Sequence, residues 1–154
     1  MELYDCINFI LNRVQNSVNS HFKAKLQPFG VTPIQYSLLK CLWTQDMQMP
    51  SQLAQTLQVD ASTITGVIER LENKQLVVRL YSREDRRSVC VCLTEKGRTL
   101  QSSIEAVIRE ANLEVTRGMR PEDVAAFKKL CISIWENAKQ SLSLIHIYEP
   151  TRHA

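Results

Sequence analysis

Residues 60–97 read DASTITGVIERLENKQLVVRLYSREDRRSVCVCLTEKG, and the spacing of their apolar residues changes partway along this stretch. The first part has the i, i+3, i+4, i+7 spacing of one helix face, carried by Ile64, Val67, Ile68 and Leu71. After Leu76, two short runs rich in β-branched and aromatic residues, 77–81 and 89–93, enclose a charged segment. The pattern predicts a helix capped by Asp60 and, after it, a β-hairpin with a long polar tip.

The residues before this stretch predict three further helices. The first spans about 2–26, where apolar residues recur at gaps of three and four. The second spans about 32–43 and begins with Thr-Pro, which are typical of an N-cap and the first helical position. The third, at 50–57, is short and connects to the helix at residue 60 through a few residues. Two short helices joined in this way form a helix-turn-helix candidate.

Two more helices are predicted after the hairpin. Thr94 caps a long helix that extends to about Arg117, and Pro121 begins the last one. The helical pattern is lost from Ser141 onward, and 144–148 has the pattern of a short β-type run. We therefore predict that 143–154 is a non-native or disordered tail, to which no function is assigned.

The predicted fold class is mainly α with a small β-hairpin, because a helix-turn-helix followed by a hairpin makes a winged helix. The winged helix-turn-helix would occupy about 32–100, flanked by N- and C-terminal dimerisation helices at 2–27 and 101–142. All of 1–142 would form a single domain, as the length of 154 residues suggests. The apolar stripes of the terminal helices need burial, either across a dimer interface or within one chain.

Composition excludes several classes of protein. No apolar run approaches the roughly 20 residues of a membrane-spanning helix, and the start lacks the basic region of a secretory signal. Five cysteines, an odd number, argue against a disulfide framework and favour a cytoplasmic protein. We find no phosphate-binding loop, nucleophile elbow or metal-ligand spacing, so neither an enzyme nor a cofactor is predicted. Two alternatives stay open: a thiol oxidoreductase using Cys90 and Cys92, and a pure interaction module.

The net charge of +3 is unevenly distributed. Residues 79–98 contain six basic and three acidic residues, whereas 99–154 contains seven of each. A local basic cluster attracts nucleic acid even when the whole chain is nearly neutral. The hairpin is therefore the first candidate for a contact with DNA.

Six segments together resemble the MarR family of bacterial transcription regulators. They are TPIQY at 32–36, QLA at 52–54, DASTIT at 60–65, RLENK at 70–74, DRR at 85–87 and LTEKG at 93–97. The resemblance implies a homodimer that binds double-stranded DNA at a palindromic operator, usually as a repressor released by a small ligand or by oxidation. Two positions depart from the family pattern: Gln75 stands where glycine is common, and Gly66 where a basic residue is common.

The helix at 60–74 is the predicted recognition helix, whose N-terminal part would enter the major groove. The DNA-binding residues predicted on the two short helices are Ser51, Gln52, Ala61, Ser62, Thr63, Thr65, Gly66 and Arg70. Hydroxyl groups can reach phosphates or base edges, glycine permits a close backbone approach, and arginine can pair with phosphate or guanine. The alternative is that this is only a solvated helix face.

The hairpin loop would be the wing. We predict that Arg83, Arg86 and Arg87 contact DNA, with an arginine in the minor groove, where the negative potential favours it. In the family that this sequence resembles, a wing aspartate pairs with the arginine two positions later, and Asp85 has that spacing from Arg87. The alternative is a charged turn that only keeps the protein in solution.

Ligands of this family bind between the dimerisation helices and the winged domain. His21, Phe29, Tyr36 and Trp43 are the candidate pocket residues for a small aromatic or phenolic effector, or else ordinary core residues. Cys6 is the candidate for a thiol-based redox sensor, because oxidant-sensing members carry their reactive thiol near this point. The neighbouring Asp5 would disfavour its thiolate. The other cysteines are expected to behave as small hydrophobic residues.

Overall fold

The computed structural model describes residues 1–85 and 87–148, and side chains as far as residue 145. Two compact units are separated at Val115 and Thr116, and each is described by itself. The elements of the first unit are η1 (Leu3–Asp5), α1 (Ile7–Leu26), η2 (Gln27–Phe29), α2 (Pro33–Thr44), α3 (Pro50–Leu57), α4 (Ala61–Asn73), β1 (Val77–Tyr81), β2 (Val89–Leu93), α5 (Glu95–Thr99) and α6 (Gln101–Val115). The second unit contains α7 (Pro121–Tyr148).

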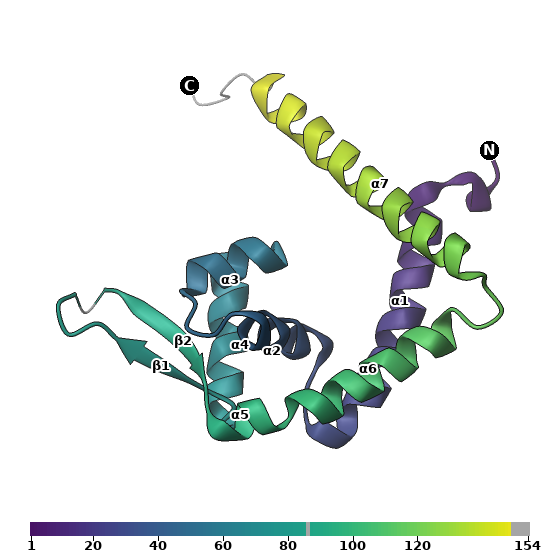
Figure 1. Ribbon diagram of the computed structural model, residues 1–154. Helices are drawn as coiled ribbons and strands as arrows, with labels where there is room; N and C mark the ends of the chain where they lie inside the picture. The colour runs from purple at the N-terminus through teal and green to yellow at the C-terminus, as the bar shows by residue number, and fades with distance from the viewer. Residues whose placement is uncertain (86, 149–154) are drawn as a thin grey trace. The chain divides into compact units, whose positions relative to one another are not determined.

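The predicted fold class is confirmed: the described chain is mainly helical, and α2, α3 and α4 are followed by a two-stranded antiparallel hairpin (Figure 1). Val77 pairs with Leu93 and Tyr81 with Val89, so the two strands match residue for residue. Gln48, in the connection between α2 and α3, forms an isolated bridge to Val91. This bridge attaches the base of the hairpin to the helix-turn-helix.

Two helices, α2 and α4, begin at the caps that the local sequence predicts. The Thr32 side chain accepts a hydrogen bond from the Gln35 backbone N–H, and the Gln35 side chain accepts one from the Thr32 N–H. This reciprocal pair is a capping box, which satisfies two backbone donors that the first turn of α2 would otherwise leave unpaired. At α4, the Asp60 carboxylate accepts the Thr63 N–H at 2.7 Å.

The C-terminus of α4 is closed by a Schellman motif. The Gln75 N–H bonds to the Glu72 carbonyl, and the Leu76 N–H bonds to the Leu71 carbonyl at 3.0 Å. Gln75 has a φ of 61°, the left-handed conformation that a side chain disfavours. The chain thus accepts local strain, estimated at about 1 kcal/mol, at a position where glycine would have none.

Gln75→Gly is expected to raise the free energy of unfolding by about 0.5–1 kcal/mol, because it removes this strain. The matched control is Gln55→Gly, in the interior of α3, where the same change should lower the free energy of unfolding by about 1 kcal/mol. Urea unfolding followed by circular dichroism measures both. Equal destabilisation by the two substitutions would contradict strain at Gln75.

The hydrophobic core lies where α1, α2, α3, α4, α6 and the hairpin meet. Its most deeply buried side chains, each at most 2% exposed, include Leu26, Leu38, Leu39, Leu42, Leu53, Ile64, Ile68, Leu71, Leu76, Val77, Val91 and Ile104. Each contributes roughly 1.5–3 kcal/mol through burial of apolar surface. The core thereby holds the exposed face of α4 and the base of the hairpin in a fixed relation.

A polar network joins α1 to α6, which pack along one another (Figure 1). Glu114 on α6 binds Lys25 at 2.8 Å and the His21 ring at 2.6 Å, both on α1. The hydrogen bond from Lys25 is the main cause that holds the pKa of Glu114 below its ordinary value, and the bond from His21 acts in the same direction. These charges therefore orient the two helices in addition to the apolar contacts.

Three element boundaries differ from those predicted. The first helix is broken at Cys6, which separates η1 from α1. The long helix predicted from Thr94 is interrupted at Leu100, whose N–H reaches the carbonyl groups of both Arg98 and Lys96. The β-type run predicted at 144–148 is wrong, because α7 continues as a helix to Tyr148. Apolar alternation over five residues was too short a signal to override helix continuation.

The prediction of a non-native or disordered tail at 143–154 concerns residues of which 149–154 lie outside those described. Within the described part of the chain, no helix is long and apolar enough to cross a membrane.

Candidate nucleic-acid interface

One face of α4 is exposed along its first two turns, opposite the buried residues that anchor the helix. Ala61, Ser62, Thr63 and Thr65 are exposed, whereas Ile64 is 1% exposed. The predicted inward stripe is thus confirmed, and the predicted contact residues lie on the surface. A helix presented in this way can place its N-terminal side chains against base edges in a major groove.

The first turn of α4 is already organised without DNA. The Ser62 hydroxyl donates to the Asp60 carboxylate at 2.9 Å, and the Thr65 hydroxyl donates to the Ala61 carbonyl at 2.8 Å. Hydrogen bonds from Thr63 and Ser62 hold the pKa of Asp60 below its ordinary value, with the backbone N–H of Thr63 as the largest cause. The hydroxyl oxygens of Ser62 and Thr65 keep lone pairs that can accept hydrogen bonds from a partner.

Gly66 leaves room for Arg70, one helical turn further along. A Cβ at Gly66 would lie 3.8 Å from the Arg70 guanidinium. The guanidinium therefore lies beside the space that a side chain at position 66 would occupy. Arg70 is exposed, and it forms no ion pair with any residue that the structure describes. The two predicted residues therefore form one feature: an exposed guanidinium beside a helix position that carries no side chain.

The start of α3 also faces outward. Ser51 is exposed, and Gln52 is exposed with its side-chain oxygen accepting the Met49 N–H at 2.8 Å. Gln52 therefore caps its own helix, and its amide NH₂ group and the second lone pair of its oxygen remain for a partner. The Ser51 hydroxyl forms no hydrogen bond with the residues that the structure describes, so it is available for the predicted contact.

The wing presents two exposed arginines. Arg83 and Arg87 are exposed and form no ion pair within the described residues. Asp85 does contact Arg87, but its carboxylate accepts the Arg87 backbone N–H at 2.9 Å rather than the guanidinium. The loop is therefore shaped by a turn around Asp85, which leaves the guanidinium of Arg87 available. Arg86 lies outside the described residues.

The rest of the basic cluster has structural partners. Arg79 on β1 binds Glu72 on α4 at 2.7 Å, and both side chains are about one quarter exposed. Arg98 on α5 binds Asp46 at 2.8 Å. Lys96 donates to the Lys74 carbonyl at 3.1 Å. The basic residues of this region thus fall into two groups. Arg83 and Arg87 face solvent, whereas Arg79, Arg98 and Lys96 bind other parts of the fold.

Asp46 is a site residue that the sequence did not reveal. Its carboxylate accepts the N–H groups of Leu93 on β2 and of its neighbour Met47, each at 2.9 Å, and binds Arg98. Asp46 therefore ties the connection between α2 and α3 to the base of the wing at Leu93 and to α5 at Arg98. No local sequence signal could show this, because Asp46 and Leu93 are far apart in the chain.

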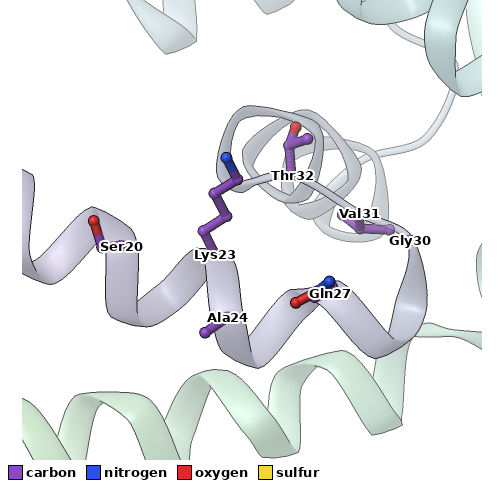
Figure 2. Close-up of a pocket in the computed structure, with 7 residues that line it drawn as sticks. All are labelled: Ser20, Lys23, Ala24, Gln27, Gly30, Val31 and Thr32. Atoms are coloured by element: carbon purple, nitrogen blue, oxygen red, sulfur yellow. The ribbon is translucent and has the colours of Figure 1, made fainter.

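A surface groove of about 390 Å³ lies on α1 and the turn that follows it (Figure 2). We call it the α1 groove. It is lined by Ser20, Lys23, Ala24, Gln27, Gly30, Val31 and Thr32. Apolar surface at Ala24 and Val31 is combined with hydroxyl, amide and ammonium groups, which is the mixture that small-molecule sites use.

The four residues predicted to line a ligand pocket do not line this groove. His21 is bound to Glu114, and Phe29 packs against the core. The Trp43 indole N–H donates to the Gly97 carbonyl at 3.0 Å, and its ring lies 6.4 Å from that of Tyr36. Burial raises the pKa of the Tyr36 hydroxyl. Their role in ligand binding stays a prediction.

The cysteines are free thiols in the described structure. Burial is the main cause that raises the pKa of both Cys41 and Cys92, which favours their neutral thiol form. Cys6 is half-buried at the N-cap of α1. The described residues contain no group of three or more side chains that could hold a metal ion.

Comparison with known proteins gives a consistent result. The model of the MarR family matches residues 31–89, from the N-cap of α2 through the wing. The chain is 28% identical over 131 residues to the HTH-type transcriptional regulator MhqR of Bacillus subtilis strain 168, covering 85% of this chain and 90% of that protein. It is 31% identical over 101 residues to an organic hydroperoxide resistance transcriptional regulator of the same strain, covering 66% and 69%.

Solved structures share the fold over most of the chain. CouR of Rhodococcus jostii RHA1, bound to p-coumaroyl-CoA, superposes with a TM-score of 0.76 and 30% identity, covering 87% of this chain and 94% of that one. A structure of the transcriptional repressor CouR on a 23-mer DNA duplex has a TM-score of 0.81 and 26% identity, covering 86% and 94%.

Proposed function

The chain belongs to the MarR family of transcriptional regulators, and we propose that it is a homodimeric repressor of a palindromic operator, released by a small ligand. It is a DNA-binding regulator, not an enzyme. The observation that carries the proposal is the combination of an exposed face on α4 with exposed Arg83 and Arg87 on the wing, which form no ion pair with any residue that the structure describes. As a regulator of transcription, it would work in the cytoplasm, where the DNA is.

The side chains of α4 and of the wing suit different parts of the DNA. Hydroxyls of α4 and the Arg70 guanidinium suit the major groove, where each base pair presents a distinct pattern of donors and acceptors. The wing arginines suit an adjacent minor groove or the phosphates, whose contacts position the protein and make binding depend on salt. The Arg79–Glu72 ion pair would keep the two contact regions in register.

Dimerisation is supported by apolar surface that one chain leaves exposed. At the start of the first unit, Leu3, Tyr4 and Ile7 are 60%, 66% and 55% exposed, and on α6 Leu113 is 73% exposed. In the second unit, α7 separately exposes Phe127, Leu130 and Trp135. Apolar side chains in this number on helices of a monomer mark an interaction surface. A second copy would bury them and place two recognition helices about 34 Å apart, one turn of DNA.

Release by a ligand is supported by the α1 groove. Its volume, about 390 Å³, falls within the range of small-molecule sites, and Lys23 adds a cation at its edge. The related CouR binds p-coumaroyl-CoA. We therefore propose a small aromatic or phenolic effector for this chain, seated in the α1 groove. The four residues predicted from the sequence, His21, Phe29, Tyr36 and Trp43, do not line this groove, so the proposed seat differs from the predicted one.

A thiol switch at Cys6 is the second candidate. One relative is a regulator of organic hydroperoxide resistance. Cys6 is a free, half-buried cysteine at the N-cap of the twenty-residue helix α1. In this case oxidation of Cys6, rather than a bound ligand, would release the DNA.

The experiment that tests the proposal is a fluorescence anisotropy screen of the full chain against duplexes from its own promoter region. Binding at low salt, with a steep salt dependence and a dimer by light scattering, is expected. Repeating the titration with phenolic compounds and with peroxide separates the two release mechanisms. Cys6→Ser should abolish the response to peroxide and leave the response to a ligand unchanged.

Two results would overturn the proposal. Absence of a shift with any duplex at low salt would indicate a pure interaction module. Turnover of a dithiol substrate by a chain that binds no DNA would indicate the thiol oxidoreductase reading of Cys90 and Cys92.

A further inference from the structure

Lys74, the C-cap residue of α4, is half-buried, and its ammonium group has no acidic partner among the residues that the structure describes. It donates to the Gly30 carbonyl and, at 2.6 Å, to the side-chain oxygen of Gln35. No carboxylate lies within ion-pair distance of it among the described residues. Its charge is therefore held by neutral oxygens, which bind an ammonium more weakly than a carboxylate does.

Both of these oxygens belong to, or support, the wall of the α1 groove. Gly30 lines the groove directly, as Figure 2 shows. Gln35 is only 3% exposed, and its side-chain oxygen also accepts the N–H of Thr32, another lining residue. A single amide oxygen thus joins Lys74 to Thr32, and both lone pairs of that oxygen are used.

The other contacts of Lys74 lead to the DNA-binding elements. Its N–H bonds to the Arg70 carbonyl at 3.2 Å, within the recognition helix. Its own carbonyl accepts Lys96 of α5, just after the wing. The next residue, Gln75, is held through its carbonyl by the Thr94 hydroxyl at 2.7 Å. Lys74 therefore touches the groove wall with its side chain and the recognition helix and wing exit with its backbone.

We propose that Lys74 is a positioning residue that couples the α1 groove to the recognition helix. In the present conformation, the wall of the α1 groove binds the Lys74 ammonium group and thereby holds the C-terminal end of α4 in place. A ligand that shifts residues 30–32 would release the ammonium and allow α4 to change its orientation. This inference rests on the proposed function, since it assumes that α4 reads DNA and that the groove is the regulatory site.

Coupling of this kind is reciprocal, so it can be tested without knowing the ligand. If the groove wall influences α4, binding of DNA to α4 must equally influence the wall. The measurement is hydrogen–deuterium exchange of the backbone amides at 30–36, in the free protein and with a saturating promoter duplex. In the natural chain we expect the duplex to slow their exchange by about threefold.

Lys74→Met removes the donor and keeps most of the side-chain volume, and Lys74→Arg keeps a cationic donor. We expect the effect of the duplex on residues 30–36 to vanish in Lys74→Met and to be retained at least in part in Lys74→Arg. Lys96→Met is the matched control, because it removes a lysine that contacts the same helix end but does not touch the groove wall. It should leave the effect of the duplex unchanged.

Gln35→Glu is a second variant that keeps the test valid if Lys74→Met does not fold. A carboxylate would hold the Lys74 ammonium more tightly, so exchange at 30–36 should slow in the free protein and the duplex should add little. Unchanged exchange in this variant would overturn the proposal.

The coupling is also overturned if the duplex binds but protects 30–36 equally in the natural chain and in Lys74→Met, or if it protects neither. A natural chain that binds no duplex is a different outcome: it refutes the proposed function, and the coupling falls with it.

Discussion

Arg83→Ala combined with Arg86→Ala is expected to weaken operator binding roughly 100-fold at moderate salt and to flatten its salt dependence. Arg83 is exposed and pairs with no acidic residue in the described chain, so its charge is available to DNA. A dimer would lose four cations at two wing tips. If each contacts one phosphate, the slope of log K against log salt should shrink by about 3–4.

The measurement is fluorescence anisotropy of a labelled operator duplex over a series of KCl concentrations. Arg109→Ala is the matched control, because Arg109 is exposed on α6, distant in sequence from the wing, and carries the same charge. It should change the slope little. The thermal midpoint should be the same in all three proteins, since the wing tip contributes nothing to the core. A double variant with the natural slope would refute a contact between the wing and DNA.

Gly97→Ala is expected to lower the free energy of unfolding by about 3 kcal/mol, the upper part of the usual range for overpacking. A Cβ at Gly97 would lie 2.2 Å from the Leu76 carbonyl oxygen, which is backbone and cannot rotate away. That oxygen also accepts the Thr94 N–H at 3.1 Å, where the chain leaves the hairpin. The added methyl group must therefore separate α5 from the base of the wing.

Gly66→Ala is the matched control for this substitution. Its Cβ would meet only the flexible Arg70 guanidinium, at 3.8 Å, so Gly66→Ala should stabilise the protein by about 1 kcal/mol through helix propensity. Urea unfolding of both variants measures the two effects. A Gly97→Ala protein with an unchanged midpoint would contradict the close approach that the structure shows.

The ends of the DNA-reading elements were predictable because their signals are local. Thr32 and Asp60 cap the helices that follow them, and strand residues begin at Val77, where the apolar period changes. In each case a few neighbouring residues determine the backbone conformation. The break at Leu100 and the continuation of α7 to Tyr148 were not predictable in this way, because the competing patterns there were short or nearly helical.

The exposed residues of α4 and the wing that we propose to contact DNA could be named from the sequence, but the ion pairs of the basic residues could not. The sequence groups Arg79, Arg83 and Arg98 in one basic cluster. In the structure, Arg79 forms an ion pair with Glu72 and Arg98 forms one with Asp46. Ion pairs between residues that are distant in sequence depend on how the elements pack. For the same reason, the α1 groove and its connection to Lys74 have no signature in the order of residues.

By itself, the sequence determined the succession of helices, the hairpin and the exposed face of α4, because helix caps, apolar period and turn chemistry act between neighbours in the chain. Only the tertiary structure decided which described basic residues form ion pairs, that Gly97 must lack a side chain, and that Lys74 lies against the groove wall. Those outcomes depend on distances between segments far apart in sequence, which are set by the shared hydrophobic core.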